Sequence, residues 1–216
     1  MILTARGAAG IGKTELVIMG IDPGLASTGV GVIASGQNGE WKSLFSDHVI
    51  TSTALTMPQR LERIHQLVQS SIAQYHPEAV SIESIFFAKN VRSAVMMAHG
   101  RGAAILAASQ SGVYVQEYPP LEIKQSVVGK GRAGKEQVRK MIAVLLKLSD
   151  IPTSDHETDA LACALCHAHR IGSALRQSTA RAVIAASTSP RGGDEDWTKR
   201  KELLAQSLSR PRRHRR

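Results

Sequence analysis

The chain has 216 residues, 43% of them hydrophobic and 21% charged, which is enough for one well-buried α/β domain with tails. No apolar run approaches the roughly 18 residues that a membrane span needs. The N-terminus also lacks the apolar region and cleavage site of a secretory signal, so we expect a cytoplasmic protein with no membrane contact. The formal net charge is +9, and residues 173–216 carry +7 of it, with eleven Lys and Arg against four Asp and Glu.

A possible phosphate-binding motif lies near the N-terminus, where Gly7–Thr14 (GAAGIGKT) matches the Walker A pattern. A working P-loop needs a strand before it and a helix after it, so that backbone N–H groups hold the phosphates. Here only six residues precede the motif, and the apolar run LVIMGID that follows it predicts a strand. We therefore interpret residues 1–16 as a flexible extension and keep a P-loop NTPase as the less favoured alternative.

The next elements alternate in a way that predicts a single α/β domain over residues 17–172. Apolar runs separated by short turns predict strands over 16–21, 28–35 and 41–51 in an antiparallel meander. Apolar residues at three- and four-residue spacing predict a helix over 57–75. Further elements follow in the order strand 78–84, helix 91–109, strand 113–118, a short helix after Pro120, and helices over 135–147 and 154–171. This order favours a mixed five-stranded sheet with helices on both faces. In the helix over 91–109 we expect an apolar stripe made of Val91, Ala94, Val95, Ala98, Ile105 and Leu106.

Two cysteines, Cys163 and Cys166, occur in the stretch CALCH. The spacing matches both c-type haem attachment and a redox Cys-x-x-Cys pair, but haem attachment needs export and no export signal is visible. A zinc site would need two more ligands at suitable spacing. The surrounding sequence is rich in alanine and resembles the interior of a helix, so we expect both cysteines to act as small core residues.

Three acidic residues lie at or near the ends of predicted elements: Asp22 after the first strand, Glu83 at the fourth, and Asp159 in the last helix. Carboxylates gathered within a few ångströms repel one another unless a cation compensates them. Oxygen ligands suit Mg²⁺ or Mn²⁺, and two such ions can support phosphodiester hydrolysis. His156 and Asp155 each share a helix face with Asp159, so either could supply a fourth ligand.

Four blocks of sequence together carry a resemblance to a known family: GIDPGLASTGVGVI, SIESIFFAKNVRSAVMMAHGRGAAILAA, EYPPLEIKQSVVGKGRAGKEQV and HETDALACAL. They resemble the RuvC family of Holliday junction resolvases, in order and over about residues 17–172. The resemblance implies a ribonuclease H-like fold and a homodimer that cuts four-way DNA junctions, in recombination and repair, with two Mg²⁺ ions per site or with Mn²⁺.

The resemblance also implies roles for particular residues. The metal-binding catalytic set would be Asp22, Glu83, Asp159 and His156, the last as fourth ligand or proton handler. The expected DNA-binding residues comprise an aromatic that stacks at the junction centre, lysines near the scissile phosphate and residues of the Gly-rich loop: Phe86, Lys89, Lys124, Lys130, Arg132 and Lys135. Without the resemblance, a core phenylalanine and a solvated loop would be the simpler interpretations.

The resemblance also implies partners, and rival functions stay open. The Gly- and Ala-rich helix over 91–109 is the candidate dimer seam, and a branch-migration complex of a junction-binding protein and a helicase ring is the expected partner. One rival is another ribonuclease H-like nuclease that acts on RNA or hybrids, and a second is a junction binder without activity. The sequence does not reveal the preferred cleavage sequence.

The C-terminal segment 173–216 is rich in Ser, Gly and Pro and ends in RPRRHRR. This composition predicts a disordered basic tail. The charge suits a polyanion such as nucleic acid, but a solubilising extension has the same composition, and the sequence does not choose between them.

Overall fold

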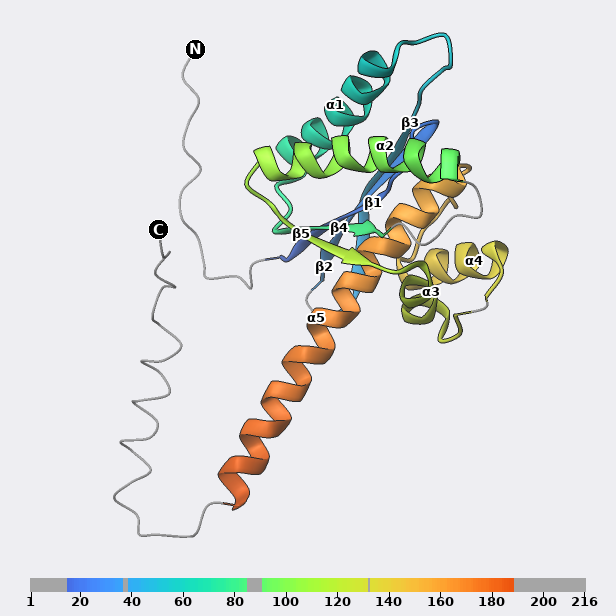
Figure 1. The fold of residues 1–216 in the computed structure, drawn as a ribbon. Coiled ribbons are helices and arrows are strands. Elements are labelled where there is room, and N and C mark those ends of the chain that lie inside the picture. Colours follow the sequence, from blue (N-terminus) through green and yellow to red (C-terminus); the bar gives the residue numbers. More distant parts are fainter. Residues whose placement is uncertain (1–14, 37–38, 85–90, 132, 189–216) are drawn as a thin grey trace, which may run out of the picture. The chain divides into compact units, whose positions relative to one another are not determined.

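The computed structural model describes residues 15–36, 39–84, 91–131 and 133–188 (Figure 1). The chain divides into two units, residues 1–172 and 173–216. The predicted P-loop Gly7–Thr14 lies outside the described residues. The first element after it is a strand that begins at Val17, whereas a P-loop requires a helix there.

The described strands form one five-stranded sheet in the order β3-β2-β1-β4-β5. Its strands are β1 (Val17–Asp22), β2 (Ser27–Ser35), β3 (Trp41–Ile50), β4 (Ala79–Glu83) and β5 (Tyr114–Tyr118). The pairs β1–β2 and β2–β3 are antiparallel, whereas β4 lies parallel to β1 and to β5. The predicted mixed sheet and its initial meander are confirmed.

Helices cover both faces of this sheet, as predicted. On one face, α1 (Met57–Tyr75) and α2 (Val91–Gln110) pack on one core cluster, which includes Met19 and Ile21. On the other, α3 (Pro120–Val128), α4 (Lys135–Leu145) and the first part of α5 (Asp155–Thr188) pack on a second cluster with Ile18. Alternate residues of β1 therefore serve opposite cores, as the two-residue period of a strand requires.

The helix α5 approaches the sheet closely because β1 and β2 present glycine there. A Cβ atom added at Gly20 would lie 2.0 Å from the carbonyl oxygen of Ala160, and one at Gly29 would lie 2.1 Å from that of His156. Real side chains do not tolerate such distances, so the backbone of α5 rests directly on the backbone of these strands. This contact sets the height of the helix above the sheet.

Two expectations about helices are corrected. The apolar stripe predicted for residues 91–109 is wrong in part, because Val95 and Leu106 are 48% and 52% exposed, while the buried positions are glycine and alanine, among them Gly100 and Ala104. Small side chains let α2 lie close to the sheet and to the turn after β1, where Gly100 adjoins Gly24. In addition, α5 extends to Thr188, so the start of the predicted disordered tail is helical.

The rest of the predicted tail, residues 189–216, lies outside the described residues, and the predicted domain division stays a prediction. Cys163 and Cys166 are buried, unpaired core residues of α5, as expected, and burial raises the pKa of both thiols. None of the helices in the described part of the chain combines the length and apolarity needed to cross a membrane.

Candidate active site

The site begins with two carboxylates on neighbouring parallel strands. Ile21 of β1 pairs with Ile82 of β4, so the next residues, Asp22 and Glu83, end their strands side by side. Because strand side chains alternate, both lie on the face that α5 covers. The carboxyl ends of parallel strands are where open α/β sheets commonly place functional groups.

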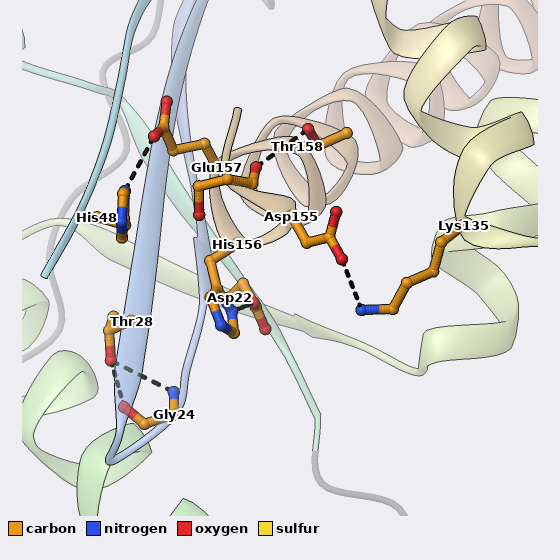
Figure 2. A network of polar contacts seen from close by, with 10 residues as sticks. Asp22, Gly24, Thr28, His48, Lys135, Asp155, His156, Glu157 and Thr158 are labelled. Atoms are coloured by element: carbon orange, nitrogen blue, oxygen red, sulfur yellow. Dashed lines mark hydrogen bonds and ion pairs between the residues drawn. The ribbon is translucent and has the colours of Figure 1, made fainter. Parts of the chain in front are cut away.

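The first turns of α5 bring the other two predicted residues to this point. Nδ1 of His156 lies 2.6 Å from Oδ2 of Asp22, and Figure 2 shows the two side chains facing each other. Asp159 follows three residues later, on the same side of the helix as His156. Asp155 instead pairs with Lys135, with its Oδ2 3.3 Å from Nζ. Of the two candidate fourth ligands, His156 is therefore the one that contacts Asp22.

The three acids influence one another electrostatically. Burial, together with the nearby carboxylates of Asp22 and Asp159, raises the pKa of Glu83 to about 7 against the opposing charge of Lys124. Burial likewise raises the pKa of Asp159 to about 6, with Asp22 as the next cause. The hydrogen bond to Asp22 raises the pKa of His156. Folding thus gathers negative charge that protons or a cation must compensate.

This set of donor groups fits divalent cations. It offers carboxylate oxygens from three separate elements and one imidazole nitrogen, and hard cations such as Mg²⁺ and Mn²⁺ prefer oxygen ligands. The raised pKa values of Glu83 and Asp159 mark carboxylates that lack sufficient positive charge nearby. A bound cation would supply that charge, so the residues suit the group that the sequence predicts.

Two of the predicted DNA-binding lysines border the same site. A pocket of about 170 Å³ has Glu83 and Asp159 in its wall together with Lys124 of α3 and Lys135 of α4. The lysines would attract an anionic group to a place next to the carboxylates. Lys130 is exposed in the loop after α3 and does not line this pocket. Phe86, Lys89 and Arg132, also predicted to bind DNA, lie outside the described residues.

Sequence reasoning missed a polar network that holds the turn after Asp22. The hydroxyl of Thr28 donates to the carbonyl oxygen of Gly24 at 2.6 Å, and the hydroxyl of Thr51 donates to that of Leu25. Nη2 of Arg60 also donates to the Leu25 carbonyl, at 3.2 Å. The turn is therefore held by β2, by the residue that follows β3, and by α1. The motif Asp22-Pro-Gly signals a turn, but nothing local identifies these partners.

Sequence reasoning also missed Glu157, which lies between His156 and Asp159 in chain order but contacts a different strand. Its Oε2 accepts a hydrogen bond from Ser46 of β3. Its Oε1 contacts Nδ1 of His48 on the same strand, as Figure 2 shows. These partners are 111 and 109 positions away, so no local pattern could have revealed the contact.

Comparison with known proteins identifies a family that matches this chain. Residues 18–167 match the family model described as crossover junction endodeoxyribonuclease RuvC. A crossover junction endodeoxyribonuclease RuvC from Ruminiclostridium cellulolyticum is 44% identical over 162 residues, which cover 74% of this chain and 97% of that protein. The solved structure of Thermus thermophilus RuvC superposes with a TM-score of 0.67 at 37% identity, covering 73% of this chain and 97% of the other.

A second Thermus thermophilus structure holds RuvC in complex with a Holliday junction substrate. It matches with a TM-score of 0.66 at 34% identity, over 73% of this chain and 97% of that one. The predicted ribonuclease H-like fold is confirmed by these neighbours. On the matched residues, the identity and the shared fold, this chain belongs to the RuvC family of crossover junction endodeoxyribonucleases.

Proposed function

We propose that this chain resolves four-way DNA junctions by metal-dependent hydrolysis of phosphodiester bonds. The observation that carries the proposal is the convergence of Asp22, Glu83 and Asp159 beside two lysines. The Thermus thermophilus relative with a bound Holliday junction supports the choice of substrate. No observation on the described residues favours RNA or hybrid substrates over junctions.

Divalent cations, Mg²⁺ or Mn²⁺, would be held by the three carboxylates together with His156. When bound at such a site, they can lower the pKa of a water molecule and stabilise a leaving oxygen. Two ions per site are part of the proposal, because the family resemblance implies them and the carboxylates come from two strands and one helix.

The remaining groups of the site would bind and orient the DNA. Lys124 and Lys135, which line the same pocket as Glu83 and Asp159, would neutralise the scissile phosphate. His156 bonds Asp22 through Nδ1, so its Nε2 is the ring atom left to coordinate or to carry a proton. Exposed Lys130 would contact the DNA backbone at the edge of the site.

A homodimer would supply paired sites, and α2 offers a surface for it. Val95, Ala98, Gly102 and Leu106 recur at three- and four-residue spacing on the exposed side of α2. A Cβ atom at Gly102 would meet nothing within 4 Å, so a second helix could approach closely there. This seam differs from the Gly100 and Ala104 side, which is used within the subunit. A branch-migration complex stays the predicted partner, and a cytoplasmic location stays a prediction.

The test is cleavage of a synthetic mobile four-way junction with Mg²⁺ or Mn²⁺, compared with EDTA, and with the two nicks mapped. We expect symmetric nicks in strands of like polarity, and little cutting of linear duplex or RNA–DNA hybrid. Asp22→Asn should abolish cutting and keep junction binding, because it removes a charge and preserves shape. Asp150→Asn, at an exposed loop carboxylate, is the matched control. Equal cutting of all three substrates, or full activity of Asp22→Asn, would overturn the proposal.

A further inference from the structure

Two consecutive residues near the start of α5, His156 and Glu157, contact different strands of the sheet. His156 reaches Asp22 on β1, and Glu157 reaches β3, where Ser46 Oγ donates to Glu157 Oε2 at 2.7 Å. Nδ1 of His48 lies 2.9 Å from Glu157 Oε1, and because a carboxylate accepts, this nitrogen donates. Both oxygens of one carboxylate are therefore engaged by a single strand, and the Glu157 side chain is only 14% exposed.

The strand register places these partners on either side of a strip of bare backbone. Asp22 pairs with Gly29, and Gly29 pairs with His48 on its other side. In the next row on the same face, Gly20 pairs with Gly31, which pairs with Ser46. The helix lies over the glycines, with a carboxylate on one flank and two polar side chains on the other.

Such a glycine strip fixes the height of a helix but offers no side chains to fix its rotation or its position along the strands. Successive residues of an α-helix point about 100° apart, so His156 and Glu157 diverge towards opposite flanks. Together they restrain the rotation of the first turn that carries Asp159. The contact between His156 and Asp22 is itself part of the proposed cation site, which leaves Glu157 as the restraint outside that site.

We propose that Ser46, His48 and Glu157 form a positioning brace that sets His156 and Asp159 relative to Asp22 and Glu83. Glu157 is a positioning residue and contacts neither the cation nor the DNA. This inference rests on the proposed function, because it assigns the brace a purpose in cation binding and cleavage.

The first experiment needs neither cation nor DNA. Amide hydrogen exchange over residues 159–162 reports on the start of α5, because the acceptors of these amides lie in its first turn. Glu157→Ala should speed this exchange selectively. Glu122→Ala is the control, since it removes another carboxylate that ties α5 to a neighbouring helix, through Arg170 at 3.1 Å. Equal exchange in the two variants over 159–162 would overturn the brace.

The second experiment measures Mn²⁺ binding by calorimetry and single-turnover junction cleavage at saturating protein. Misplacement of catalytic groups by about 1 Å can cost on the order of a hundredfold in rate. We expect Glu157→Ala to slow cleavage by about ten- to a hundredfold, to weaken Mn²⁺ binding, and to leave junction affinity unchanged. Glu157→Gln should recover part of the cleavage rate and part of the Mn²⁺ affinity, because its amide can still form hydrogen bonds with Ser46 and His48.

Ser46→Ala removes one contact of the brace and guards against a variant that fails to fold. It should show a smaller effect than Glu157→Ala, and the two should not add, since they break the same contact. If the wild type neither binds Mn²⁺ nor cuts, the proposed function is wrong, while the exchange result still decides the brace. If the wild type does both and Glu157→Ala matches it, the function stands and the brace is wrong.

Discussion

Replacing Glu83 by glutamine should stabilise the cation-free protein while it destroys activity. Burial and two neighbouring carboxylates raise the pKa of Glu83 from 4.5 to about 7, so the folded state holds a proton that the unfolded chain releases. The folded protein therefore binds more protons than the unfolded one between these two values, and stability falls as the pH rises through that window. This difference in pKa between the folded and unfolded states lowers the free energy of unfolding by about 3 kcal/mol once the pH exceeds both pKa values.

Glutamine cannot ionise, so Glu83→Gln avoids this loss. We expect its free energy of unfolding in EDTA to exceed that of the wild type by about 2 kcal/mol at about pH 8.5. The increase is smaller than the full effect of the pKa shift, because burying the glutamine amide is itself unfavourable. The difference should shrink towards zero near about pH 5, where the wild-type carboxyl is protonated in the folded protein. Urea unfolding followed by circular dichroism measures both values.

The matched control is Glu62→Gln, which changes an exposed carboxylate on α1 and should show no such dependence on pH. Adding Mn²⁺ should stabilise the wild type and not Glu83→Gln, because ligand that binds only the folded state raises its stability. A Glu83→Gln protein that is no more stable than the wild type at high pH, or a gain that persists unchanged at low pH, would refute the reasoning.

The other predictions concern the glycine contact and the titration of the site. Gly29→Ala should lower the free energy of unfolding by about 3 kcal/mol or more and impair cleavage, because its Cβ would clash with the backbone of α5. Gly36→Ala should be nearly neutral, because its Cβ would meet only the carbonyl oxygen of Glu40, at an ordinary contact distance of 3.5 Å. Equal urea midpoints for these two variants would contradict the close approach. Mn²⁺ affinity should increase from about pH 6 to about pH 8, because the cation must displace protons from Glu83 and Asp159, whose pKa values are about 7 and about 6. Calorimetry in two buffers of different ionisation enthalpy would detect the released protons, and a pH-independent affinity would count against protonated carboxyls in the cation-free site.

The order of elements and the identity of the candidate acids followed from the sequence. Hydrophobic periodicity is a local property, so the helix over Met57–Tyr75 and the strand–turn–strand meander were predictable from spacing alone. Asp22 and Glu83 could be identified as candidates because they lie where predicted apolar strands end. Periodicity was less informative for α2, where alanine and glycine serve the buried side and larger apolar residues lie outside.

Only the tertiary structure decided how the acids meet. The contact between His156 and Asp22 spans 134 positions, and that between His48 and Glu157 spans 109, so both depend on strand register and on the docking of α5. The raised pKa values of Glu83 and Asp159 arise from burial and from one another's charge, and neither exists in the extended chain. The sequence by itself determined which groups are present and in which elements. The glycine strip and the register decided their distances, because separations between remote residues are set by packing and not by local pattern.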